Sequence, residues 1–116
     1  MAIKLNQAAV DRAKNLIKAG EVESFDTDWN EEKPTPTEVD HFISTHYMKE
    51  YGEWFLGKNT DIEDTKKEHY LYPHGDLKEV QRCALVDSIA KAEKKGDKDI
   101  ACAATELLGL VDKKAK

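Results

Sequence analysis

Side chains able to do chemistry are concentrated between residues 41 and 74 of this chain. That block holds all four histidines and seven of the nine aromatic residues. Histidine, tyrosine and tryptophan coordinate metals, exchange protons, or line ligand and partner surfaces. The same block could equally supply the core of a small domain, and the sequence leaves both roles open. The candidate partner- or ligand-binding residues are Trp54, His69, Tyr70, Tyr72, His74 and Arg82.

The histidine spacing argues against a metal centre. His41 and His46 are five residues apart, as are His69 and His74, whereas two ligands on one helix face need a spacing of three or four. The chain has no paired-cysteine motif and no HExxH motif. We therefore expect no metal and no cofactor. A site that combines His69 and His74 with nearby carboxylates is the open alternative.

Patterns typical of an enzyme are missing from the sequence. Cys83 stands in an apolar stretch with no histidine near it, and the serines lack a nucleophile-elbow motif. The six glycines are scattered and form no phosphate-binding loop. We therefore assign no catalytic residue, and the sequence favours a binding protein over an enzyme.

Arg82 is one of only two arginines and lies in an apolar stretch. It has two interpretations. It can tie down the segment 58–75 through a carboxylate or carbonyl group, or it can anchor an anionic ligand. The first interpretation is favoured.

The charge distribution limits the partners. The net charge of −5 disfavours nucleic acid, because phosphate neutralisation needs a basic surface. No apolar run approaches the roughly 20 residues that span a bilayer, and the N-terminus has no apolar signal region. We expect a soluble protein in the cytoplasm, with no membrane partner.

Residues 21–40 form a strongly acidic segment with a single base, Lys33. The simpler interpretation is a loop exposed to solvent. The more specific interpretation is a binding surface for a basic partner, as in a protein that mimics nucleic acid. The acids are Glu21, Glu23, Asp26, Asp28, Glu31, Glu32, Glu38 and Asp40.

Hydrophobic periodicity predicts a mostly α fold: about four helices around one core, within a single domain over 1–116. The second helix carries Gly52, which predicts a break or a close packing contact. Residues 21–36 and 58–75 are expected to be irregular, with at most a short extended segment near Tyr70, and residues 113–116 to fray. The expected helices cover 7–19, 37–56, 76–95 and 97–112.

Local signals define the helix ends. Asn6 is the expected cap of the first helix, and Asp76 with Glu79 gives the clearest helix start in the chain. Gly96 separates the last two helices, which predicts a C-terminal αα-hairpin. In that hairpin Cys83 and Cys102 lie roughly 20 Å and 9 Å from the turn, too far apart for a disulfide. We therefore expect free thiols.

Several segments of the C-terminal half carry a resemblance to a known protein type. The runs are 51–57 (YGEWFLG), 63–67 (EDTKK), 70–76 (YLYPHGD), 82–86 (RCALV), and Ile100 with 103–108 (AATELL). Together they resemble a type of small bacterial and phage-associated protein. The resemblance implies a helical domain of bacterial or phage origin. It implies no catalytic residue, because that type carries no assigned activity.

These observations support two functional hypotheses from different classes. The first is a helical protein-interaction or adaptor module that uses the acidic segment 21–40 or the segment 70–76 as its surface. The second is a small-ligand or metal-binding protein, conceivably an enzyme, with a pocket near Tyr72, His74 and Arg82.

Overall fold

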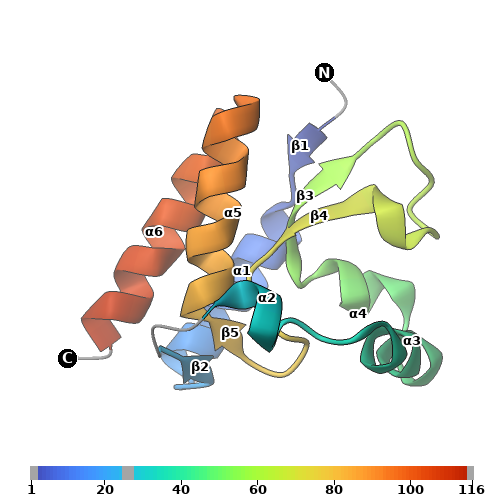
Figure 1. Ribbon diagram of the computed structural model, residues 1–116, viewed down its shortest axis with the longest axis horizontal. Helices are drawn as coiled ribbons and strands as arrows, with labels where there is room; N and C mark the ends of the chain where they lie inside the picture. Colours follow the sequence, from blue (N-terminus) through green and yellow to red (C-terminus); the bar gives the residue numbers. More distant parts are fainter. Residues whose placement is uncertain (1–2, 25–27, 115–116) are drawn as a thin grey trace.

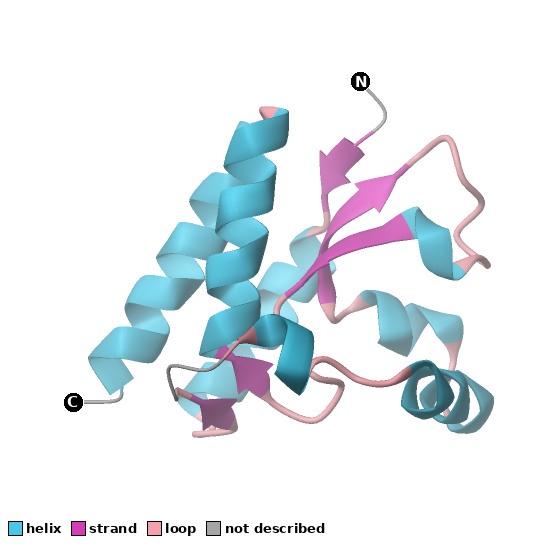
Figure 2. Ribbon diagram, viewed as in Figure 1, coloured by secondary structure: helices cyan, strands magenta, loops and turns pink. Residues whose placement is uncertain are grey.

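The computed structural model describes residues 3–24 and 28–114 (Figure 1). A hairpin of two long helices forms one side of the molecule, and a three-stranded sheet with short helices forms the other (Figure 2). The elements in chain order are β1 (Ile3–Leu5), α1 (Gln7–Lys18), β2 (Val22–Glu23), α2 (Trp29–Glu32), α3 (Pro36–Thr45), α4 (Met48–Gly52), β3 (Phe55–Asn59), the 3-10 helix η1 (Lys67–His69), β4 (Tyr70–Pro73), β5 (Val80–Gln81), α5 (Arg82–Lys95) and α6 (Lys98–Lys114).

The fold is mixed α/β. In the described part of the chain, helices make up 59% and strands 16%; there are six helices, four of them with seven or more residues, and two sheets. The prediction of a mostly α fold with four helices and at most one short extended segment is therefore wrong.

The main sheet has the order β1-β3-β4, with both pairs antiparallel. Strand β3 lies in its centre, where the sequence predicted the end of a helix and a loop. Gly57 makes this position possible, because a Cβ there would lie 2.9 Å from both Ile100 and Tyr72. Close packing of the strand against α6 thus overrides the helical periodicity of the preceding residues.

One long helix was expected over 37–56, and the chain instead forms α3, α4 and the start of β3. Helix α3 ends at Thr45, and the next residue, His46, has an extended backbone with φ −133° and ψ 170°. Helix α4 ends at Gly52, where a Cβ would overlap the ring of Tyr70. A helix break between residues 49 and 50, or close packing of another backbone, was expected at Gly52; instead α4 runs through that point to Gly52, and the Tyr70 side chain packs on it.

The helix start expected at Asp76 is also wrong, since α5 begins at Arg82. The Asp76 carboxylate does accept backbone N–H groups two and three residues on, from Lys78 at 3.1 Å and Glu79 at 3.0 Å. These bonds close a turn before the short strand β5, which pairs with β2 in parallel. An aspartate followed by free amides can cap a turn as well as a helix.

The C-terminal αα-hairpin is confirmed. Helices α5 and α6 pack along each other, and Gly96 between them has a left-handed φ of 81°. Cys83 is buried, Cys102 is exposed, and both are free thiols, as expected. In the described part of the chain, no helix has the length and apolar character needed to cross a bilayer.

The main core lies between the sheet and helices α1, α5 and α6. A smaller cluster joins Trp29 of α2 to Cys83 and Ala84 of α5, so Trp29 fastens the acidic segment to the body. Phe25, the other aromatic residue of that segment, lies outside the described residues. The largest fully buried side chains of the protein are Leu56, His74, Val80, Leu85, Ser88, Ile100, Leu107 and Val111.

Candidate functional site

The structure does not gather the six candidate residues around one pocket. Trp54, Tyr72 and His74 belong to the interior, with exposed fractions of 4%, 6% and 0%. His69 and Tyr70 line a pocket beside α4. Arg82 starts α5, where its Nε donates to Asp112 Oδ1 of α6 at 2.7 Å. Tyr72, His74 and Arg82 line none of the three hollows described below.

His74 is a neutral core histidine. Its Nε2 lies 2.8 Å from the carbonyl oxygen of Glu53, which can only accept, so Nε2 carries the proton. Its Nδ1 is sealed from solvent and has no partner among the described residues. Burial, together with a smaller effect of the positive charge of Arg12, lowers the pKa of the imidazole to about 4. The ring stacks obliquely beside Trp54, with centroids 5.2 Å apart.

Tyr72 fixes the turn between the last two helices to the sheet. Its hydroxyl donates to Asp97 Oδ2 at 2.5 Å, and Asp97 itself is only 9% exposed. Burial raises the pKa of the phenol, and the bond to the carboxylate raises it further. The Tyr72 backbone has a left-handed φ of 65°, unusual for a residue with a Cβ. This arrangement serves structure, and it leaves the hydroxyl no access to a ligand.

We expect Tyr72→Phe to lower the free energy of unfolding by about 1–3 kcal/mol, because it leaves the buried Asp97 carboxylate without its donor. Tyr70→Phe is the matched control. It removes an exposed hydroxyl bond to the Asp64 carbonyl, which water replaces, and should cost less than about 1 kcal/mol. Urea unfolding at neutral pH measures both. Equal losses in the two variants would contradict the structural role of Tyr72.

Arg82 forms an inter-helix ion pair. In addition to the Nε bond, its Nη2 lies 3.5 Å from Asp112 Oδ2. Asp112 lies on α6, so this contact does not tie down the segment 58–75. Its partner group is a carboxylate, and guanidinium groups favour two-point contacts of this type.

A hollowed surface lies along α3, and sequence reasoning missed it. Two hollows of 550 and 430 Å³ adjoin there, and we call them together the α3 groove. None of the α3 residues is buried, and Phe42 packs against the main core with only part of its surface. The two hollows share Phe42, His46, Leu77 and Lys78.

The floor of the α3 groove is aromatic and apolar. The His46 ring stacks on Phe42, with centroids 4.1 Å apart and planes 6° from parallel. Leu77 faces them from the opposite wall with a left-handed φ of 72°. A leucine held in this region of backbone space costs on the order of 1 kcal/mol or more, and such strain is frequent at functional sites. The bonds to Asp76 Oδ1 hold this turn in place.

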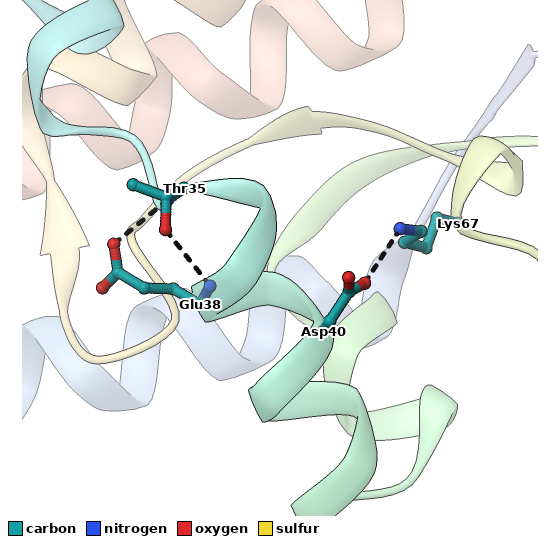
Figure 3. Close-up of polar contacts among 4 residues, drawn as sticks. All are labelled: Thr35, Glu38, Asp40 and Lys67. Carbon is teal, nitrogen blue, oxygen red and sulfur yellow. Dashed lines mark hydrogen bonds and ion pairs between the residues drawn. The ribbon is translucent and has the colours of Figure 1, made fainter.

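Helix α3 is fixed to the body by surface contacts (Figure 3). Thr35 and Glu38 form a capping box, with bonds of 3.1 and 3.2 Å. The Thr35 backbone N–H lowers the pKa of the Glu38 carboxyl. Asp40 binds Lys67 Nζ at 3.1 Å, the ion pair that links α3 to η1. Exposed pairs contribute little to stability, so α3 can adjust to a partner at low cost.

Negative charge gathers around Asp76, which is one of the residues that line the α3 groove. Burial raises the pKa of the Glu79 carboxyl, and the charges of Asp76, Glu23 and Glu21 raise it further. We call these four residues the acidic rim. The rim joins part of the acidic segment 21–40 to the turn at 76–79.

No cluster of three or more His, Cys, Asp or Glu side chains able to hold a metal ion occurs in residues 3–24 and 28–114. Comparisons of the chain with protein-family models, curated proteins and solved structures find no match. The resemblance to small bacterial and phage-associated proteins gains no support from these comparisons and stays a prediction.

Proposed function

We propose that the chain is a protein-interaction module that binds a basic, amphipathic segment of a partner protein in the α3 groove. The observation that supports this most is the lining of the groove, which joins the stacked rings of Phe42 and His46 to a surplus of acidic side chains. The acidic residues of the lining are Glu38, Glu50, Glu53 and Asp76, and its lysine and arginine residues are Arg12 and Lys78. A segment with one or two apolar side chains and flanking lysine or arginine residues would complement both features.

The groove is also accessible to a partner. Helix α3 has no buried residue, and an exposed ion pair between Asp40 and Lys67 links it to η1. Tyr47, which follows α3, is 79% exposed, and tyrosine is enriched at protein interfaces. The alternative of a ligand pocket near Tyr72, His74 and Arg82 gains no support, because two of these residues are buried and the third pairs with Asp112.

The test is selection of random-sequence peptides on the wild-type protein, followed by affinity measurement. We expect the selected peptides to combine positive charge with apolar residues. A variant of the acidic rim carries Glu21→Gln, Glu23→Gln and Glu79→Gln. It should bind the selected peptides at least about tenfold more weakly, because it removes much of the negative potential that attracts them. Their affinity for the wild type should also fall as salt is added.

A charge-matched control separates location from net charge. The variant Glu93→Gln, Asp99→Asn, Glu106→Gln also removes three negative charges, but from exposed positions on α5 and α6. Glu106 pairs with Lys14 only at the surface, so little stability is lost. The control should bind as the wild type does. Equal weakening in both variants, or selected peptides without positive charge, would refute the proposal.

A further inference from the structure

A second pocket lies where the N-terminus of α1, helix α4 and the segment before β4 meet. Its volume of 390 Å³ is within the range of small-molecule sites. It is separate from the α3 groove, apart from Glu53, which lines both. We call it the α1–α4 pocket.

One set of groups that line the α1–α4 pocket is suited to a negative group. Asn6 precedes α1, but its side chain donates to the carbonyls of Gly52 and Phe55, at 2.9 and 3.0 Å. It therefore caps none of the α1 amides, and the first turn of α1 has no acidic residue. Ala8 of this turn lines the pocket together with Lys49. Free amides at a helix start and a lysine attract a carboxylate.

Two other lining groups, His69 and Asp64, are suited to a positive group. His69 is only 7% exposed, and its Nδ1 lies 2.6 Å from the carbonyl oxygen of Ile62, so Nδ1 carries the proton. Its Nε2 is then an acceptor with no partner among the described residues, and it is not sealed from solvent. Tyr70 also lines the pocket, and its hydroxyl donates to the Asp64 carbonyl.

The charged groups of the pocket are uncompensated within the protein. Among the described residues, neither Lys49 nor Asp64 has an ion-pair partner within 4.0 Å. Both signs are present, with Lys58 and Glu53 as the second pair in the lining. A purely anionic ligand would therefore be repelled by Asp64 and Glu53, and a purely cationic ligand by Lys49 and Lys58.

We propose that the α1–α4 pocket binds a small zwitterion of the α-amino acid class. The ligand carboxylate binds the α1 amides and Lys49, and the ligand ammonium donates to His69 Nε2 and Asp64. Each end of the ligand supplies the partner that the protein groups lack, which is why two charges of opposite sign are required. The observation that carries the proposal is the buried His69 acceptor that lines a pocket with an uncapped helix start.

The experiment is a titration of the isotope-labelled full chain with each of the twenty free L-amino acids, followed by amide NMR shifts. A concentration of about 5 mM detects millimolar affinity. We expect at least one amino acid to shift the amides of Ala8, Thr65 and His69 in a saturable manner. Its N-acetyl and carboxamide derivatives should bind at least about tenfold more weakly, since each lacks one charge.

Matched variants complete the test. Lys49→Gln and Asp64→Asn change exposed residues, and each should weaken binding at least about fivefold while the fold is kept. Lys94→Gln and Asp99→Asn change exposed residues of α5 and α6 and should leave binding unchanged. The proposal is overturned if no amino acid shifts these amides, if a derivative binds as well as its parent, or if the pocket variants bind as the controls do.

Discussion

Replacing Gly75 with alanine is expected to lower the free energy of unfolding by about 3 kcal/mol, a large share of the stability of a domain of this size. A Cβ at this position would overlap the backbone carbonyl oxygen of Glu79 and the indole ring of Trp54. Neither group can move freely. Glu79 accepts the Asp76 N–H at 3.2 Å within the turn, and Trp54 is 4% exposed in the core.

The control for this prediction is Gly109→Ala, the same substitution in the middle of α6. A Cβ there meets nothing within 4 Å, and the residue is exposed. Alanine is preferred over glycine within a helix by about 0.5–1 kcal/mol, so this variant should be more stable than the wild type. Urea unfolding of both proteins compares the effects directly. Stabilisation by Gly75→Ala would mean that the turn at 75–80 is not packed against Trp54 as described.

Strong local signals were predictive of the fold. Helix α1 has a regular apolar stripe with Gly20 behind it, and Gly20 adopts the expected positive φ of 79°. The hairpin of α5 and α6 follows from Gly96 and from a clean stripe on α6. In these elements local propensity and tertiary packing agree, so the sequence alone defines them.

The strands could not be predicted, because their stability comes from partners distant in sequence. Strand β3 is only five residues long and pairs with β1 and β4 on its two sides. Its residues carry no alternation of apolar and polar side chains that would distinguish a strand from a helix end. Asp76 was mistaken for a helix start for a related reason. Its carboxylate accepts the Glu79 N–H in a turn, and the same hydrogen bond would form at the start of a helix.

The candidate site was predicted only in part. Composition directed attention to residues 41–74, and Phe42, His46 and His69 of that block line the two surfaces that we propose to bind partners and ligands. The sequence could not separate His46 and His69 from His74, a histidine that is fully buried. Leu77 carried no signal at all, because its exposure on a strained turn depends on the fold around it.

Acidification is expected to remove about 3 kcal/mol of stability through His74 alone. The pKa of this imidazole is about 4 in the folded protein, against about 6.5 in an unfolded chain. Between these values the unfolded state binds a proton that the folded state does not, so stability rises with pH there. The contribution is fully present above pH 6.5, is lost as the pH falls from 6.5 to 4, and does not change further below 4.

Two measurements isolate this effect from the carboxylates, which also destabilise proteins in acid. In the folded protein, the NMR resonance of the His74 ring should stay that of a neutral imidazole down to about pH 5, and in urea it should titrate near 6.5. The difference in unfolding free energy between the wild type and His74→Gln should then narrow between pH 6.5 and 4, because glutamine takes up no proton. The carboxylates cancel in this difference. A His74 ring that titrates near 6.5 in the folded protein would show that it reaches solvent, and the sealed position of Nδ1 beside Trp54 would be wrong.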